Sequence, residues 1–342
     1  MNLSTSSSDR RARRRSRYSR DLACIALFAG VFALMTGGWL LIPASMAAGF
    51  RPLLMDIEQA PSADWYLGNV NAQVEQFAVY DNLDGAAEAL KRADVLFVGD
   101  SLILFAFQNQ QVLQRFFSAR SLRYYFLAFS GEADETFTEQ IIHKFSLHPK
   151  WVIVDADYFF GRPPSAAASR AMASGSQEAW KIRFETATSL AVQRQIHQVY
   201  PYMGLSQWDV HPQWIWYRSK TDGSMSLAAW RGVPGVIPDT SFSNLLLQED
   251  RNTPLLSGEM NAARRFKSEL DARGARLVLT WTPPNTGANA AHLASGLQVP
   301  LVTTDARGLS TLDGQHLDRE SSARFSASFL EGLDSILGQA AK

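Results

Sequence analysis

The sequence of 342 residues contains one cysteine, Cys24, so no disulfide can form within the chain and cysteine usage does not indicate a compartment. It has no net charge, with 33 basic and 33 acidic side chains, whereas nucleic-acid-binding domains carry an excess of positive charge. It also lacks the H-E-x-x-H zinc pattern, CxxC pairs and a glycine-rich phosphate loop. We therefore expect no metal, no cofactor and no nucleic-acid partner.

The positive charge that is present gathers at the N-terminus. Residues 1–21 contain seven arginines, and residues 22–42 contain no charged side chain. A helix needs about 20 apolar residues to cross a bilayer, and basic flanking residues stay on the cytoplasmic side. We predict a cytoplasmic tail and a retained transmembrane anchor, which in a bacterium gives a single-pass inner-membrane protein whose remaining residues are periplasmic. The alternative is a cleaved signal peptide, because 45–48 has small residues suited to cleavage.

Beyond a linker with leading helices at 43–90, short apolar runs alternate with helical stretches. Continuous apolar runs of this length are typical of strands buried on both faces of a parallel sheet. The alternation predicts an α/β domain over 91–342, with a parallel sheet flanked by helices. Residues 162–256 interrupt the rhythm and are predicted to form an insertion over the rim of the site. The predicted strands are 94–98, 122–129, 151–155, 276–282 and 300–303, and the predicted helices are 102–118, 135–145, 258–273 and 319–337.

Polar residues follow these strands. In open parallel sheets, ligands bind beyond the carboxyl ends of the strands. We therefore expect residues from distant parts of the chain to gather on one rim, namely Asp100, Ser101, Gly131, Asp155, Asp157, Asn285, Asp313 and His316.

Two of these places carry motifs. Val98-Gly99-Asp100-Ser101-Leu102 resembles the first signature block of the SGNH (GDSL-like) hydrolases, and Asp313-Gly314-Gln315-His316-Leu317 resembles their final DxxH block. The two motifs stand in the family's order, one after the first strand and the other before the last helix. The resemblance implies the SGNH fold, a flavodoxin-like three-layer sandwich, and the activity of a serine esterase or O-acyltransferase.

The resemblance assigns Ser101 as the nucleophile, His316 as its general base and Asp313 as the residue that orients the imidazole. A serine hydroxyl needs such a base, and a carboxylate stabilises the imidazolium that forms. Ser101 would begin a helix, where backbone N–H groups favour a developing oxyanion. The plainer alternatives are an N-cap serine at 101 and a polar turn at 313–316.

The family's second and third blocks supply the remaining donors to the oxyanion, and this chain matches only the second. The family's second block supplies a glycine N–H, and Gly131 occupies that place. Its third block supplies an asparagine amide, but this chain has Asp155-Ala156-Asp157 there, and a carboxylate repels an oxyanion. We therefore place Asp100, Asp155 and Asp157 only on the rim and take Asn285, in a Pro-Pro-Asn turn, as the replacement amide. Gly131 and Asn285 also suit turns for purely structural reasons.

The anchor, the two motifs, the aspartates and aromatics after the third strand and the Pro-Pro turn resemble one branch of the family. Its members are accessory proteins of cell-surface polymer modification, such as alginate O-acetylation and teichoic-acid D-alanylation, and act beside a multispanning membrane O-acyltransferase. The resemblance implies O-acetyl transfer or removal on a cell-envelope polysaccharide. The alternatives are a non-catalytic assembly or binding component and, third, a lipase-like esterase.

An aromatic cluster lies within the predicted insertion. Aromatic faces stack on sugar rings, but they also fill cores, and we favour the core interpretation. The cluster comprises Tyr202, Trp208, Trp214, Trp216, Tyr217 and Trp230.

Overall fold

The computed structural model describes residues 30, 60–69, 74–131, 134–157, 159–199, 214–230, 237–238, 257–285 and 287–339. The predicted tail and anchor at 1–42 lie outside these residues, apart from Gly30, as do Tyr202 and Trp208. Within the described part of the chain, no helix combines the length and apolar character needed to cross a bilayer.

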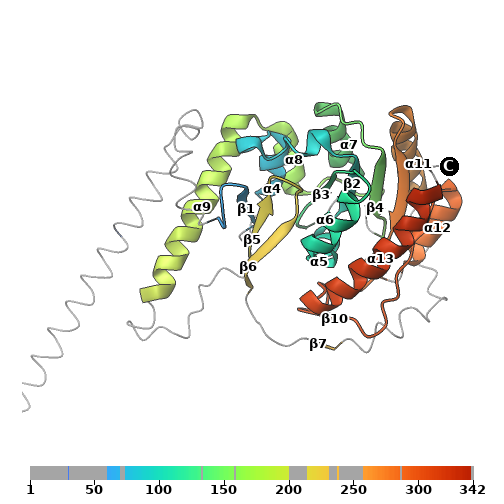
Figure 1. Ribbon diagram of the computed structural model, residues 1–342. Coiled ribbons are helices and arrows are strands. Elements are labelled where there is room, and N and C mark those ends of the chain that lie inside the picture. The colour runs from blue at the N-terminus through green and yellow to red at the C-terminus, as the bar shows by residue number, and fades with distance from the viewer. Residues whose placement is uncertain are drawn as a thin grey trace, which may run out of the picture.

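A parallel sheet of five short strands forms the centre of the molecule (Figure 1). Its strands are β2 (Val95–Gly99), β3 (Tyr124–Ala128), β4 (Trp151–Asp155), β8 (Arg276–Thr280) and β9 (Leu301–Val302). Every residue of β2, β3 and β4 is buried, which explains why these strands are continuous apolar runs rather than alternating ones. The spatial order is β3-β2-β4-β8-β9, which is the doubly wound order 2-1-3-4-5 when these strands are counted along the chain. The predicted α/β class with a parallel sheet flanked by helices and all five predicted strand positions agree with the structure.

Helices cover both faces of this sheet (Figure 1). One layer contains α5 (Ser101–Ala106), α6 (Gln110–Ser118) and α13 (Arg319–Gln339), and the other contains α7 (Glu135–Lys144), α11 (Ser257–Ala272) and α12 (Ala288–Leu297). In the first layer, the ring of Phe97 lies 5.1 Å from that of Phe107 and 6.1 Å from that of Phe329. The sequence predicted one helix over 102–118, whereas the structure has two, α5 and α6, separated by a break in the helix. The helix α12 was not predicted from the sequence.

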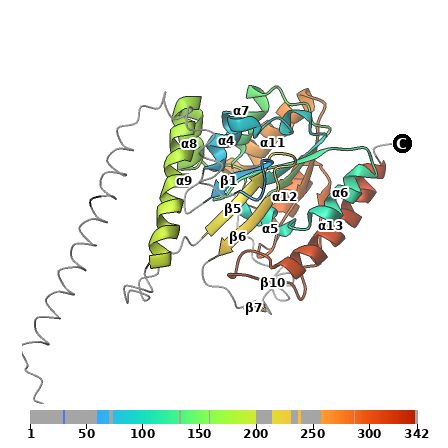
Figure 2. The same ribbon diagram turned by 60° about the vertical axis from the view of Figure 1, so that its left-hand side comes forward.

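A second, antiparallel sheet lies beside the first. It contains β1 (Trp65–Asn69), β5 (Trp214–Ser219) and β6 (Met225–Trp230), in the order β1-β5-β6. Figure 2 shows this sheet between α9 (Ser176–Val199) and the parallel sheet. The prediction of helices for the leading segment is wrong at β1, where an aromatic-rich sequence suits a pleated, half-buried surface. The described part of the leading segment does contain the helix α4 (Glu75–Tyr80), followed by short 3-10 helices at Leu83–Gly85 and Leu90–Arg92.

The described part of the predicted insertion pairs with the rest of the domain. It contains α8 (Ala166–Ala173), α9, β5 and β6, and β5 pairs with β1 from a distant part of the chain. A short ladder also joins β7 (Ile237–Pro238) to β10 (Ser310–Thr311), close in sequence to Asp313. Trp216 and Tyr217 of β5 are each only 2% exposed, which supports the core interpretation for these two aromatics.

Candidate active site

Ser101 lies at the turn from β2 into α5. Asp100 is the N-cap of α5, and its Oδ1 accepts a 2.7 Å hydrogen bond from the backbone N–H of Leu102. Gly99 lies in a tightly packed place, because a Cβ at this position would lie 3.0 Å from Cβ of Asp155 and 3.2 Å from Ile103. Since β2 and β4 are neighbours at the point where the strand order reverses, Ser101 stands at the switch point where doubly wound sheets bind ligands.

His316 reaches Ser101 from the other end of the chain. Ser101 Oγ lies 2.9 Å from His316 Nε2, although the two residues are 215 positions apart. His316 Nδ1 lies 2.9 Å from Asp313 Oδ2. Because a carboxylate can only accept, Nδ1 carries the hydrogen and Nε2 faces the serine hydroxyl as an acceptor. The structure thus joins the three residues in one continuous hydrogen-bonded chain.

The loop before α13 holds Asp313 in this arrangement. Its Oδ1 accepts the backbone N–H of His316 at 2.8 Å and that of Gln315 at 3.1 Å, which leaves Oδ2 for the imidazole. Burial alone would raise the pKa of Asp313, but its hydrogen bonds to the ring and backbone of His316 outweigh burial and lower the pKa below its usual value. The orienting carboxylate is therefore ionised at neutral pH.

Two polar residues connect the helix that contains Ser101 with the segment that contains His316. Ser322, fully buried in α13, donates to the carbonyl of Ala106 at 3.1 Å and accepts from the N–H of Gln108 at 3.0 Å. The side chain of Gln108 donates in turn to the carbonyl of Leu317 at 3.0 Å. The two bonds of Ser322 use backbone groups that the break between α5 and α6 exposes, so the break contributes to the geometry of the site.

Aromatic packing orients the imidazole further. The ring of Phe105 lies 4.3 Å from the ring of His316, and both residues are buried. Trp216, from the second sheet, packs edge-on against Phe105 at 5.9 Å. The second sheet therefore supports the helix that bears the nucleophile, and the imidazole has little room to rotate.

Two aspartates next to the nucleophile have perturbed ionisation. Burial raises the pKa of Asp100 to about 6. Burial, together with the nearby charges of Asp100 and Asp157, raises the pKa of Asp155 well above its usual value. Asp155 Oδ2 is buried and makes no hydrogen bond within the described part of the chain. The raised pKa favours the neutral form of Asp155, which repels an oxyanion less than a carboxylate does.

The other predicted rim residues have separate positions. Asp157 is buried and accepts hydrogen bonds from the backbone N–H groups of Gly287 and Ala290, each at 3.2 Å, so it holds the N-terminus of α12 rather than facing a substrate. Gly131 is exposed and follows β3. Asn285 is half-buried in the turn after β8, where its N–H donates to Thr282. Neither Gly131 nor Asn285 hydrogen-bonds to Ser101 in the described structure.

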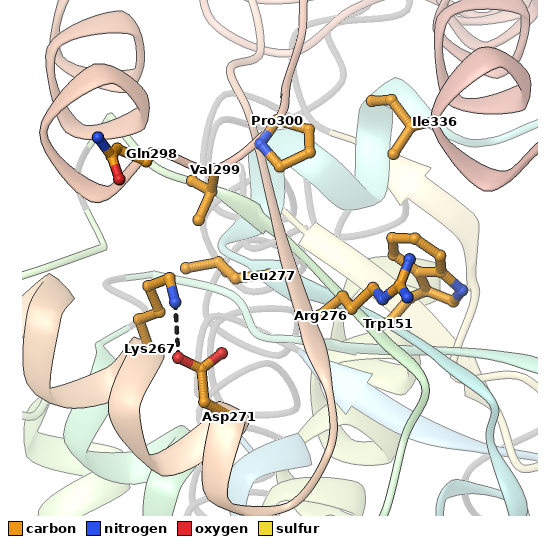
Figure 3. A pocket seen from close by; sticks show the side chains of 9 residues that line it. All are labelled: Trp151, Lys267, Asp271, Arg276, Leu277, Gln298, Val299, Pro300 and Ile336. Carbon is orange, nitrogen blue, oxygen red and sulfur yellow. Dashed lines mark hydrogen bonds and ion pairs between the residues drawn. The ribbon is translucent and has the colours of Figure 1, made fainter. Parts of the chain in front are cut away.

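A hollow of about 300 Å³ lies at the amino ends of β4 and β8, at the end of the sheet away from Ser101. Figure 3 shows Trp151 and Arg276 on one wall and the 2.6 Å ion pair of Lys267 with Asp271 on another. This hollow is separate from the serine site. Among the described residues, no group of three or more histidine, cysteine, aspartate or glutamate side chains is arranged to hold a metal.

The fold and the site together define an α/β protein with a serine–histidine–aspartate chain at the carboxyl edge of a doubly wound sheet. No protein-family model, no curated protein and no solved structure matches this chain.

The sequence did not identify several residues that support the site. Glu75 and Arg218 form a fully buried ion pair, and Ser322 and Gln108 connect the two halves of the site. A signal exists for the ion pair, because each charge stands directly beside large apolar side chains, in Val-Glu-Gln-Phe and in Trp-Tyr-Arg. Buried charges are rare unless they are paired, so two such positions suggest partners.

Proposed function

We propose that this protein is an extracytoplasmic, membrane-anchored acyl esterase or O-acyltransferase of the SGNH type that acts on O-acyl groups of a cell-envelope carbohydrate. The observation that carries the proposal is the chain of two 2.9 Å contacts from Ser101 through His316 to Asp313. Nucleophile, base and orienting carboxylate within hydrogen-bond distance are what acyl transfer through a serine requires. The anchor rests on the uncharged run at 22–42 and the arginines before it, and the carbohydrate substrate rests on the sequence resemblance alone.

The proposed reaction has two halves. Ser101 Oγ adds to the ester carbonyl while its proton passes to His316 Nε2, and collapse of the tetrahedral intermediate transfers that proton to the departing alcohol. The acyl-Ser101 ester is then attacked by a second hydroxyl compound, with His316 again accepting and returning the proton. Water as the acceptor gives an esterase, and a sugar hydroxyl gives a transferase. Asp313 stabilises the imidazolium in both halves.

Stabilisation of the oxyanion calls for donors at the same edge. The N–H of Ser101 begins α5 and is a candidate, whereas the N–H of Leu102 is already bonded to Asp100. We assign the N–H of Gly131 as a second donor and the side chain of Asn285 as a third. Donors placed in this way stabilise charge that develops only in the transition state.

A serine-directed fluorophosphonate probe tests the nucleophile in the full chain purified in detergent. We expect labelling that disappears in Ser101→Ala and persists in Ser118→Ala, which removes an exposed serine at the end of α6. Folded wild-type protein that labels no faster than Ser101→Ala would contradict the proposal. Release of acetate from an O-acetylated polysaccharide, with and without an unmodified acceptor glycan, then distinguishes esterase from transferase, and the matching O-acyltransferase would be the membrane partner.

A second candidate function is a non-catalytic binding or assembly component. One observation favours it: Asp155-Ala156-Asp157 occupies the place where the resembled family has an asparagine amide, and Asp157 is engaged with α12. This candidate predicts that Ser101→Ala leaves polymer modification in cells unchanged. Loss of modification in that variant, with a normal amount of protein, decides against it.

A further inference from the structure

The loop after β3 carries Gly131 and is held by side chains rather than by a further strand. β3 is the edge strand of the parallel sheet and has β2 on one side only. The N–H of Phe129 still bonds to Gly99 on β2, so the backbone groups of residues 126, 128 and 130 face outward. Buried backbone groups of this kind need partners.

Arg218 of β5 supplies two of those partners, and the carbonyl of Asp222 accepts the N–H of Phe126 at 2.8 Å. Arg218 Nη2 donates to the carbonyl of Phe126 at 2.9 Å, and its Nη1 donates to that of Ala128 at 2.6 Å. Nη1 also bonds to Glu75 Oε2 at 2.7 Å, and both side chains are 0% exposed. The other carboxylate oxygen of Glu75 accepts the N–H of Ser130. The ion pair, together with the carbonyl of Asp222, thus takes the place of a neighbouring strand along the edge of β3.

Ser130 is held at its other polar atoms as well. The side-chain amide of Gln76 donates to the carbonyl of Ser130 at 3.2 Å, and that of Asn69 donates to its hydroxyl at 2.7 Å. The carbonyl of Ser130 and the N–H of Gly131 belong to one planar trans peptide unit, in which they point in opposite directions. Fixing the carbonyl therefore fixes the direction of the Gly131 N–H.

We propose that Glu75, Gln76 and Arg218 are positioning residues that hold this peptide unit, so that the N–H of Gly131 faces the acyl oxygen of an ester at Ser101. The inference rests on the proposed acyl-transfer function and extends it to a segment that precedes the parallel sheet. Gly131 itself makes the contact with the reacting group, and the three residues act through it. The second sheet and α4 thereby become parts of the catalytic apparatus.

Gln76→Met is the sharpest test, because it keeps the length of the side chain and removes the donor to Ser130. Gln76 Oε1 has no hydrogen-bond partner in the described structure, so the substitution strands only the Ser130 carbonyl. We expect kcat for p-nitrophenyl acetate hydrolysis by the full chain to fall about 10- to 100-fold, because a misdirected oxyanion donor loses most of its effect. KM and the midpoint of the pH profile should stay unchanged.

Leu270→Ala is the matched control. Leu270 is fully buried in α11 on the other side of the domain, so its truncation lowers the thermal midpoint without touching the loop. In protein labelled with ¹⁵N at glycine, the Gly131 amide resonance should move in Gln76→Met and stay in place in Leu270→Ala. This readout does not depend on turnover.

Wild-type turnover with an undiminished kcat in Gln76→Met would overturn the positioning inference and leave the triad intact. An equal loss of kcat in Leu270→Ala would also overturn it, because general destabilisation would then explain the effect. Absence of both turnover and fluorophosphonate labelling in the wild type would remove the proposed function and, with it, this inference.

Discussion

Replacing Arg218 by methionine should destabilise the protein far more than loss of an ordinary ion pair. The guanidinium is 0% exposed and makes four hydrogen bonds, to Glu75 Oε2 and to the carbonyls of Gly223, Ala128 and Phe126. Breaking one side of a buried ion pair costs about 3–5 kcal/mol, and the stranded carbonyls add to this. We expect a loss of about 5 kcal/mol at pH 7, a large share of the 5–15 kcal/mol typical of natural domains.

The pH dependence of that loss gives a second check. In Arg218→Met the carboxylate of Glu75 is buried without a counter-charge, so the folded state takes up a proton that the unfolded state lacks above about pH 4. Since the folded state then binds more protons, the stability of the variant should rise as pH falls from 7 toward 4. The double variant Arg218→Met/Glu75→Gln removes both charges and should recover part of the loss.

Urea unfolding followed by circular dichroism measures both effects in the full chain in detergent. Lys267→Met is the control, because its ion pair with Asp271 is partly exposed and should be worth less than about 1 kcal/mol. A loss below about 1 kcal/mol in Arg218→Met, or a double variant no more stable than the single one, would refute this account of the edge of β3.

Three further predictions follow from the site and its supports. Asp313→Asn should lower kcat for ester hydrolysis by about 10³- to 10⁴-fold with little change in KM, because the imidazole loses the partner that fixes its tautomer; steady-state kinetics measures this, and a drop below about tenfold contradicts it. Asp100→Asn should flatten the fall in thermal midpoint that occurs as pH rises from about 4 to 6. Burial raises the pKa of Asp100 to about 6, so the folded state binds more protons than the unfolded state in this range and loses stability as the carboxyl ionises. An unchanged slope in a calorimetric pH series would show that other groups cause the fall. Gly223→Ala should cost about 2 kcal/mol or more, because φ is +67° there and a Cβ would lie 2.5 Å from the carbonyl oxygen of Phe126; an unfolding midpoint equal to that of wild type would be inconsistent with this geometry.

The parallel sheet could be predicted from the sequence because its strands are short, continuous apolar runs. Burial on both faces imposes that pattern locally, so β2 and β4 are visible without knowledge of their neighbours. The same locality made Ser101 and His316 recognisable, since each lies in a short motif at a strand or helix boundary. Both motifs were expected at the carboxyl edge of the sheet, and there Ser101 Oγ lies 2.9 Å from His316 Nε2.

The second sheet could not be predicted in the same way. β1 belongs there because it pairs with β5, which lies far along the chain, and nothing in Trp65–Asn69 identifies that partner. The break after α5 depends on Ser322 of α13, whose hydroxyl hydrogen-bonds to the freed carbonyl of Ala106 and the freed N–H of Gln108. Asp157 looked like a rim residue because it follows β4, and only the position of α12 shows where its carboxylate goes. In each case a tertiary contact decides the outcome.

The separation of Ser101 from His316 along the chain has a consequence for biosynthesis. During translation Ser101 is synthesised long before His316. The imidazole reaches its position only after α13 has been synthesised as far as Ser322 and Ser322 has bonded to the end of α5. A nascent or prematurely terminated polypeptide therefore carries a hydroxyl without its base. Under the proposed mechanism, such a product could not attack esters on its way to its destination, and enzymatic competence would report that synthesis had passed Ser322 of α13.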